Sequence, residues 1–417
     1  MPNMPPDIAY EHASTLSIED HFDRSSGSWK QPFEGPLWSV VFHAHKKGLM
    51  GKDRKVAIID SGFDLGIKRL KDAARGSCVQ ESRLGGATAH GTMVALLINE
   101  IAPQATLDLY EVSTGGKPDA ALLKKALRMV EKSDADIVNL SLGHSTVQGD
   151  GEVCECLLAA EVTRLAQSKK LVVAACGNEV GPLKCPAQLN SVLSVGYSNE
   201  RREIKWDGDV PVREVSIADR PDFGQSMLAN ALVRQPPDIA GSSFAAPMVC
   251  GLAALSPPLT HKEEWSDVLR QAAFASDVMA LGDPKLQEKF PWEEPITALD
   301  VLPAAGTSPL LSWMTHWIYI NYAQYLMMQD YARALEQAHK AVEIAPWSDS
   351  AWSTFAGINM HLVDALDLSR LDHRAAAIGY LQKAVNAYDR TLEIRENHEV
   401  YSYWRQHCLN RLAELTA

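Results

Sequence analysis

The sequence predicts an α/β domain with a doubly wound, mostly parallel sheet, followed by an all-α domain of helical hairpins. Over about residues 35–305, short apolar runs of strand type alternate with stretches of helical periodicity, which is the pattern of a parallel sheet covered by helices. After Leu310 strand signals nearly vanish, and Pro346 is the only proline of residues 310–417. The predicted parts are an N-terminal arm (1–34), the α/β domain (35–305) and a helical, tetratricopeptide-like domain (306–417).

The predicted strands are short runs that are rich in β-branched residues. They follow residues 1–34, a polar stretch with many Pro, Ser, Asp and Gly residues that we expect to form a loosely ordered arm. Binding and catalytic groups of a doubly wound sheet gather at the carboxyl ends of its strands, which is where Asp60 falls. The strands are expected at Lys55–Ile59, Thr106–Val112, Ile137–Leu142, Leu171–Ala175 and Ser191–Val195.

Helical periodicity fills the intervals between these strands. It is clearest over about residues 118–133, where the apolar residues share one helix face. Residues 199–238 are polar and weakly periodic, which indicates loops and short strands before a helix that begins near Ser243. The other expected helices cover about 88–100, 153–168 and 262–276, and a proline-rich connector covers 279–309.

In the helical domain, small residues recur at one offset on two helices, each of which follows a more aromatic helix. This arrangement resembles tetratricopeptide helical hairpins. The two sets begin 384 − 334 = 50 residues apart, not about 34, and an insertion around residues 360–376 would account for the difference. A generic helical bundle explains the same stripes equally well. The sets are Ala334, Ala338 and Ala341, and Ala384, Tyr388 and Thr391.

Composition and charge exclude several classes of function. The balance of 40 Lys and Arg against 52 Asp and Glu gives a net charge of −12, which argues against a protein that binds the phosphate backbone of nucleic acid. The N-terminus lacks a basic segment followed by an apolar run, as a secretory signal has, and no window is apolar enough to span a membrane. We therefore expect a cytoplasmic protein without nucleic-acid or membrane partners.

The 7 cysteines are an odd number without a secretory signal, which fits a reducing compartment. Cys154, Cys156, Cys176 and Cys185 can be considered as zinc ligands. However, their spacing fits no common zinc site, and Cys176 lies in a strongly apolar run. We therefore expect buried or idle thiols, no bound metal and no cofactor.

Three segments carry groups that make chemical sense together. Asp60 ends a predicted strand, His90 opens a predicted helix, and Ser243 begins another. A serine hydroxyl is a poor nucleophile unless a base removes its proton, and the base needs a carboxylate to orient it. A fourth group, Asn178, follows the strand at 171–175 and can donate a hydrogen bond to a developing oxyanion.

Each of these residues alone has a plainer interpretation. Asp60 and Asn178 can be turn residues after strands. His90 can form a local hydrogen bond at a helix start, and Ser242 or Ser243 can be a helix N-cap. All four groups in one α/β domain, each at a strand end or helix start, are much less expected by chance.

Together the four segments resemble the subtilisin-like serine protease family. The family's blocks (I/V)-D-(S/T)-G, H-G-T-x-V-A, A-A-x-G-N and G-T-S-x-A-x-P stand here as IIDSG, HGTMVA, AACGN and GSSFAAP. A fifth segment, DIVNLSLG at 136–143, resembles the family's strand beside the path of the substrate. The resemblance covers about residues 35–305 and implies peptide-bond hydrolysis through an acyl-enzyme.

The resemblance also implies the role of each site residue. Ser243 is the third residue of the G-x-S block and would be the nucleophile. His90 would be the general base and then the general acid, and Asp60 would hold its tautomer. The side chain of Asn178 and the backbone N–H of Ser243 would form the oxyanion hole. The substrate would be bound by Ser141, Leu142 and Gly143, as a strand partner, and by Ala175 and Gly177, as a pocket wall.

The sequence departs from the family pattern without losing a catalytic group. Ser242 replaces the usual Thr, Met93 a frequent second His, and Met248 and Cys250 a frequent His and Ala. Only about 34 residues precede the match, whereas secreted members carry a signal and a prodomain. The inhibitory and folding roles of a prodomain are therefore expected to be absent or supplied otherwise, and no calcium loop is readable.

These observations lead us to expect an intracellular serine endopeptidase that acts on proteins or peptides. The helical domain would recruit a partner or substrate, or restrain the protease. One alternative is a scaffold protein with a vestigial protease domain, against which stands the presence of all four catalytic groups. A second is an esterase, against which stands the absence of a G-x-S-x-G motif around Ser243.

Overall fold

A computed structural model of the chain forms two compact units. Unit 1 comprises Met1–Ala273 with Ser308–Leu310, and unit 2 comprises Phe274–Thr307 with Leu311–Ala417. The predicted limits of the three domains remain a prediction. The structure describes residues 9–10, 18–30, 36–77, 86–114, 117–144, 156–177, 184–189, 191–195, 205–207, 210–212, 241–257, 288, 290–293, 296 and 308–416.

Unit 1 is built on a six-stranded parallel sheet, which confirms the predicted α/β class. The strand order is β12-β11-β9-β4-β6-β5. β4 lies between β9 and β6, so its last residue, Asp60, is at the carboxyl edge of the inner sheet. The strands are β4 (Lys55–Asp60), β5 (Ala74–Ser77), β6 (Thr106–Glu111), β9 (Ile137–Leu140), β11 (Leu171–Ala175) and β12 (Leu193–Val195).

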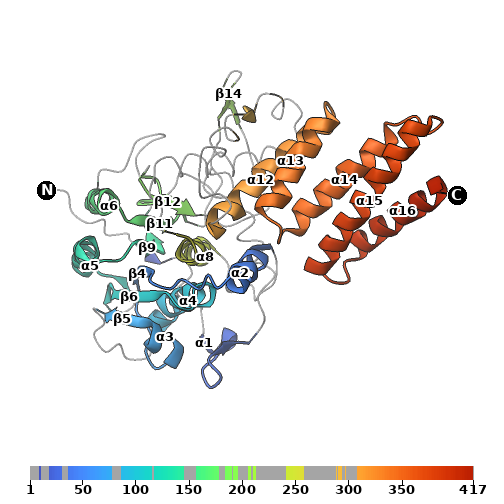
Figure 1. Cartoon of the computed structure of the whole chain (residues 1–417). Coiled ribbons are helices and arrows are strands. Elements are labelled where there is room, and N and C mark those ends of the chain that lie inside the picture. The colour runs from blue at the N-terminus through green and yellow to red at the C-terminus, as the bar shows by residue number, and fades with distance from the viewer. Residues whose placement is uncertain are drawn as a thin grey trace. The chain divides into compact units, whose positions relative to one another are not determined.

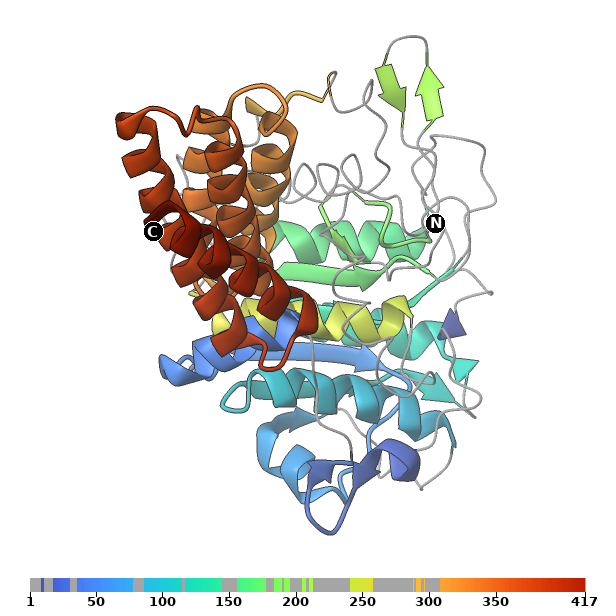
Figure 2. The same ribbon diagram turned by 90° about the vertical axis from the view of Figure 1, so that its right-hand side faces the viewer.

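Helices cover both faces of this sheet (Figure 1). α5 (Ala120–Lys132) and α6 (Leu157–Gln167) lie on one face, and α4 (Gly86–Ile101) and α8 (Ser242–Leu255) lie on the other. α4 packs directly beside α8 (Figure 2). Side chains alternate between the two faces of a strand. Every second residue of the inner strands therefore faces α5 and α6 and joins the core beneath them.

Two of the helices around the sheet, α5 and α6, begin where a side chain satisfies the first backbone N–H groups. Asp119 caps α5 by accepting hydrogen bonds from the N–H groups of Ala121 and Leu122, both at 2.9 Å. Cys156 caps α6 by accepting from Ala159 N at 3.3 Å. These caps explain why the helices start later than the predicted positions 118 and 153.

Short elements complete unit 1. The predicted strand at 137–142 divides at Ser141 into β9 and β10 (Leu142–Gly143), and β10 pairs antiparallel with β1 (Ala9–Tyr10). The short helices are α1 (Ile18–His21), α2 (Pro36–Lys46) and α3 (Lys68–Ala73). The remaining hairpins join β2 (Phe22–Asp23) to β3 (Ser28–Trp29), β7 (Ser113–Thr114) to β8 (Lys117–Pro118), and β13 (Lys205–Asp207) to β14 (Val210–Val212).

The C-terminal region is all-helical, as predicted. The last four helices pack as three consecutive pairs, α13 on α14, α14 on α15 and α15 on α16. Both predicted stripes of small residues are buried, and the segment 360–376 ends one helix and begins a longer one. Tetratricopeptide repeats remain a prediction. The helices are α12 (Pro309–Leu326), α13 (Tyr331–Ile344), α14 (Asp349–Asp364), α15 (Leu371–Ile394) and α16 (Glu399–Thr416).

The helices in the described part of the chain are all too short or too polar to cross a membrane. The predicted helix at 262–276 and most of the predicted loop region 199–238 lie outside the described residues.

Candidate active site

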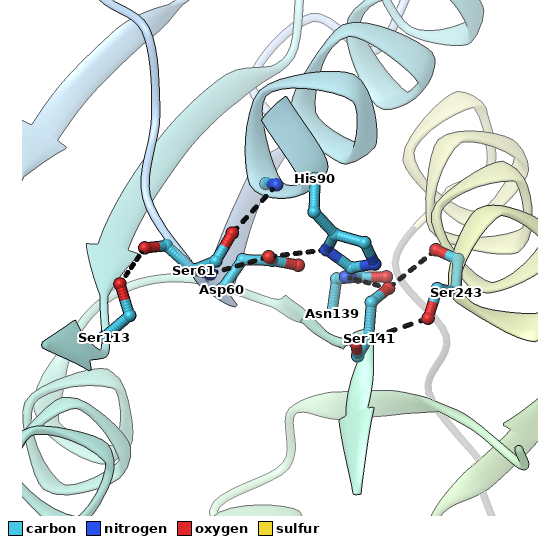
Figure 3. Close-up of polar contacts among 8 residues, drawn as sticks. Asp60, Ser61, His90, Ser113, Asn139, Ser141 and Ser243 are labelled. Carbon is cyan, nitrogen blue, oxygen red and sulfur yellow. Dashed lines mark hydrogen bonds and ion pairs between the residues drawn. The ribbon is translucent and has the colours of Figure 1, made fainter. Parts of the chain in front are cut away.

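The carboxylate of Asp60 faces the imidazole of His90 at the edge of the sheet (Figure 3). Asp60 Oδ1 lies 2.7 Å from His90 Nδ1, and both side chains are fully buried. The backbone N–H of Ser61 donates to the same oxygen at 2.6 Å. Because a carboxylate only accepts hydrogen bonds, Nδ1 must carry the proton, which puts the lone pair of a neutral ring on Nε2.

Backbone ties between the Asp-Ser-Gly and His-Gly-Thr segments hold this pair together. The N–H of Gly91 donates to Ser61 Oγ at 3.3 Å, and the N–H of Asp64 donates to Thr92 Oγ1 at 2.9 Å. A Cβ on Gly91 would lie 2.5 Å from the carbonyl oxygen of Gly62. Glycine is therefore required at 91, because any side chain would push α4 and its histidine away from the end of β4.

Ser243 is the second residue of α8, and it is fully buried. Its backbone N–H belongs to the first turn, whose N–H groups have no carbonyl partner within the helix and attract negative charge. The imidazole of His90 lies between Asp60 and Ser243 (Figure 3). The next residue, Phe244, packs against that imidazole with ring centroids 5.4 Å apart.

The hydroxyl of Ser243 donates to the carbonyl of Ser141 at 3.4 Å, a long and therefore weak hydrogen bond. Rotation about the Cα–Cβ bond moves this oxygen between staggered positions. The weak contact therefore leaves the hydroxyl able to turn toward another acceptor.

Pro247 leaves one carbonyl of α8 without its helical donor. It lies inside the helix and has no N–H, so it cannot bond the carbonyl of Ser243 four residues before it. Ser141 Oγ fills this role by donating to the Ser243 carbonyl at 2.8 Å, and Asn139 Nδ2 donates to Ser141 Oγ at 3.0 Å. The end of β9 therefore fixes the backbone of the serine.

Ser242 links the other side of the helix start to β11. Its Oγ accepts a hydrogen bond from Gly177 N at 3.1 Å. Gly177 has a φ of 103° and Gly241 a φ of 119°, which are conformations that favour glycine. The hydroxyl of Ser242 is thus used in a backbone contact.

The predicted site residues fall into three groups. Asp60, His90 and Ser243 come together from β4, α4 and α8. The predicted substrate-binding residues Ser141, Leu142, Gly143, Ala175 and Gly177 are all buried. Asn178 lies outside the described residues, so its predicted place in an oxyanion hole stays a prediction.

Sequence reasoning missed several supporting residues. The roles of Ser61 and Thr92 in joining two segments, of Asn139 in holding Ser141, and of Phe244 against His90 emerge only from the fold. Cys250 donates to Asn139 Oδ1 at 3.5 Å, and burial raises the pKa of its thiol well above its usual range. The only sequence signal for these residues was their position within the family blocks.

Comparison with known families gives a match to the subtilase family over residues 51–292, which is more than half of the chain. The chain belongs to the subtilase family. It is a subtilisin-like serine protease, as the resemblance of its sequence blocks implied.

This subtilase is similar to several characterised proteases. It is 28% identical over 233 residues to the "Major intracellular serine protease" of Bacillus subtilis (strain 168), a match that covers 50% of this chain and 70% of that protein. It is 28% identical over 262 residues to "Subtilisin E" of the same organism, covering 57% of this chain and 64% of that protein. A solved structure of a lanthipeptide protease is 21% identical, with a TM-score of 0.39, and the match covers 58% of this chain and 90% of that one.

Proposed function

We propose that this subtilase is an intracellular endopeptidase that uses Ser243, His90 and Asp60 as a catalytic triad. The observation that carries the proposal is the buried 2.7 Å contact between His90 Nδ1 and Asp60 Oδ1, with Ser243 at the helix start on the other side of the ring. That contact fixes the tautomer in which Nε2 can accept a proton, which is what a general base for serine requires.

In the proposed reaction, Ser243 Oγ turns from the Ser141 carbonyl and attacks the carbonyl carbon of a peptide bond. His90 Nε2 takes the hydroxyl proton, and Asp60 stabilises the imidazolium that forms. The negative charge of the tetrahedral intermediate is received by the backbone N–H of Ser243 and the side chain of Asn178. His90 then gives its proton to the leaving amine, and the acyl-enzyme remains.

Hydrolysis of the acyl-enzyme repeats these steps with water in place of the serine. His90 removes a proton from water, the hydroxide adds to the ester carbonyl, and the proton returns to Ser243 Oγ as the acid leaves. No cofactor is required for either half-reaction.

The substrate we propose is an extended stretch of a protein or peptide. Its backbone would pair with the Leu142–Gly143 edge, where β1 pairs antiparallel in this structure. Ser141 would support the serine rather than contact the substrate, because its hydroxyl is already bound to the Ser243 carbonyl. Ala175 and Gly177 would form a wall of the pocket.

We further propose that the helical region, read as tetratricopeptide-like hairpins, binds a protein partner or recruits the substrate, and that the protein works in the cytoplasm. The similarity to a protease described as intracellular supports this location. A groove of about 640 Å³ between helices of unit 2 offers a surface for such a partner. It is lined by Ala332, Leu335, Glu336, His339, Lys340, Glu343, Phe355 and Lys383.

A fluorophosphonate probe tests the catalytic proposal, because it reacts only with an activated serine. We expect the wild-type protein to be labelled, Ser243→Ala to be unlabelled, and the adjacent Ser242→Ala to keep its label with altered kinetics. Wild-type protein that stays unlabelled would favour the vestigial alternative. Equal labelling of Ser243→Ala would assign the reaction to another serine.

Removal of residues 311–417 tests the role of the helical region. We expect the shortened protein to cleave a short peptide at the wild-type rate and to cleave a protein substrate more slowly, since only the protein substrate would use the second surface. Unchanged cleavage of both the short peptide and the protein substrate, together with unchanged partner binding, would contradict the recruitment proposal.

A further inference from the structure

Three side chains that can bind a metal come together outside the proposed triad. They are His144, directly after β10, Cys156, at the start of α6, and Cys185, in the segment 184–189. Their ligand atoms all lie within 4.8 Å of one another. His144 Nε2 is 3.3 Å from Cys156 Sγ, and Cys156 Sγ is 3.6 Å from Cys185 Sγ.

The backbone holds these side chains in place. His144 and Cys185 form an antiparallel bridge, in which His144 N donates to Cys185 O at 3.1 Å and Cys185 N donates to His144 O at 3.0 Å. A Cβ on Gly143 would lie 2.8 Å from the Cys185 carbonyl oxygen, so glycine at 143 permits the approach. Cys156 is fixed by its contact with Ala159 N at the cap of α6. The cluster therefore rests on three segments that the fold itself brings together.

Two of the three separations between these atoms are close to those of a tetrahedral zinc site, and the third is no more than 4.8 Å. With Zn–S bonds of about 2.3 Å and Zn–N bonds of about 2.0 Å, a tetrahedral ion separates two sulfur atoms by about 3.8 Å and a sulfur from a nitrogen by about 3.5 Å. The observed separations of 3.6 Å and 3.3 Å are slightly shorter than these values. We propose that His144, Cys156 and Cys185 bind a Zn²⁺ ion as two thiolates and one imidazole.

Binding of Zn²⁺ to these three side chains balances in charge and in protons. Both thiols lose a proton to solvent on binding, and the two thiolates neutralise the charge of the ion. His144 binds as the neutral imidazole through Nε2. Water or another ligand completes the fourth position of the tetrahedron.

The presence of the histidine favours zinc over a disulfide bond between the two cysteines. A disulfide would need the sulfur atoms at about 2.05 Å, whereas they lie 3.6 Å apart. A disulfide would also leave no role for His144, whose Nε2 lies 3.3 Å from Cys156 Sγ. Three convergent atoms of two ligand types are what a borderline-soft cation such as Zn²⁺ selects.

The position of the ion gives it a structural role. It would link the residue after β10, the start of α6 and the segment at 184–189, and so brace the Leu142–Gly143 edge. Zinc binding does not depend on the proposed protease chemistry, and the measurements below separate the two.

Metal content of the purified full-length protein tests the proposal. After exchange against limiting Zn²⁺ and removal of loosely bound ion, we expect about one zinc per chain. We expect Cys156→Ser, Cys185→Ser and His144→Ala to lose that zinc. Cys408→Ser is the matched control, because it removes a buried cysteine of unit 2 and should keep the zinc.

Cobalt substitution gives a readout that does not depend on activity. Co²⁺ in the wild-type protein should show the intense visible bands of a tetrahedral ion and a thiolate charge-transfer band in the near ultraviolet. His144→Cys should keep the bound ion and strengthen the charge-transfer band, since it adds a third thiolate. This variant keeps the test valid if a ligand-deleting variant fails to fold.

Three results would overturn the zinc proposal: a wild-type protein that binds no zinc or cobalt, ligand variants that bind as much zinc as the control, or a Cys156–Cys185 disulfide found by mass spectrometry of the unreduced protein. Ligand variants that lose zinc and keep fluorophosphonate labelling would support the metal site and leave the triad proposal unaffected. A wild-type protein that binds zinc and is not labelled would contradict the triad proposal and leave the metal site unaffected.

Discussion

At the scale of single residues, Asp60 has the most direct effect on the proposed chemistry. It accepts two hydrogen bonds through Oδ1, from His90 and from the backbone of Ser61. Among the described residues, its Oδ2 has no hydrogen-bond partner. The neighbouring imidazolium is therefore the group that would compensate this buried charge during the reaction.

Replacing Asp60 with Asn should keep the fold and reduce kcat by about 10⁴-fold, because the amide can donate to Nδ1 and favour the wrong tautomer. Hydrolysis of a short peptide under saturating conditions measures the loss. Asp108→Asn is the control, since burial raises the pKa of Asp108 on the adjacent strand and a neutral amide is tolerated there. An Asp60→Asn protein as active as this control would contradict the proposed role.

The hydrogen bond between Ser141 and the Ser243 carbonyl should depend on Pro247. Ser141→Ala leaves that carbonyl without a donor and should cost about 1–3 kcal/mol of stability. Pro247→Ala supplies an N–H four residues after Ser243, so the double variant should be more stable than the sum of the single losses predicts. Chemical unfolding of the wild-type protein, the two single variants and the double variant gives the coupling energy. Strictly additive losses would show that Ser141 does not stand in for the missing helical donor.

The sequence predicted the residues of the proposed triad because each lies in a local block whose letters are themselves informative. It could not predict the cluster of His144, Cys156 and Cys185, because their spacing along the chain matches no common zinc motif. The backbone bridge between residues 144 and 185 joins positions that only the fold brings together. The proposed zinc site therefore departs from the expectation of no bound metal.

At the scale of elements, α4 and α8 must approach closely to bring the histidine and the serine to the same edge. Gly251 of α8 permits this, since a Cβ there would lie 2.7 Å from Ile101 Cβ of α4. Elements with a clear apolar pattern were predicted well, such as β4 and α5. α3 and β5 were missed, because their sequences, KRLKDA and ARGS, hold too few apolar residues to show a period.

Gly251→Ala should destabilise unit 1 by about 1–3 kcal/mol through overpacking. Gly357→Ala is the matched control on another helix, α14, where a Cβ would have no atom within 4 Å. It should be neutral or stabilising by up to about 1 kcal/mol. Hydrogen exchange of peptides from each helix during urea titration measures both, and equal effects would show that the contact with Ile101 is relieved without cost.

His316 of α12 should make unit 2 sensitive to acid. It is fully buried beside Trp313, and burial lowers its pKa to about 3, despite the hydrogen bond from Nδ1–H to the Ser312 carbonyl at 3.0 Å. Because the folded pKa lies below the unfolded value of 6.5, the stability is complete above pH 6.5 and is lost as the pH falls toward 3.

Between pH 6 and pH 4 this histidine should lower the free energy of unfolding by about 1.4 kcal/mol per pH unit. His316→Phe should remove that part of the slope. Urea unfolding followed by tryptophan fluorescence compares the two proteins, and equal slopes would show that His316 is protonated without unfolding.

At the scale of the whole molecule, the parallel sheet places the ends of β4, β9 and β11 side by side, and three distant segments of the chain meet there. The fold class followed from the alternation of strand and helix patterns. The pairing of β1 with β10 could not be predicted in this way, since residues 1–34 carry no strand signal. A pairing of two residues depends on the partner that tertiary structure supplies.

Deleting residues 1–10 should lower KM for a long peptide several-fold and leave kcat nearly unchanged, because the proposed substrate would no longer compete with β1 for the Leu142–Gly143 edge. Steady-state cleavage of a long and a very short peptide checks this. The short peptide is the control, as it does not reach the edge. An unchanged KM for the long peptide would show that the substrate binds elsewhere.

The tether of β1 to the rest of the chain would give the proposed competition an unusual property. A segment linked to its own binding site acts at a fixed local concentration, on the order of millimolar for a short flexible connection. Dilution of the protein therefore cannot release it, in contrast to a separate inhibitor. A cut between β1 and the sheet would end the effect of the tether, so a single cleavage would permanently remove the proposed restraint.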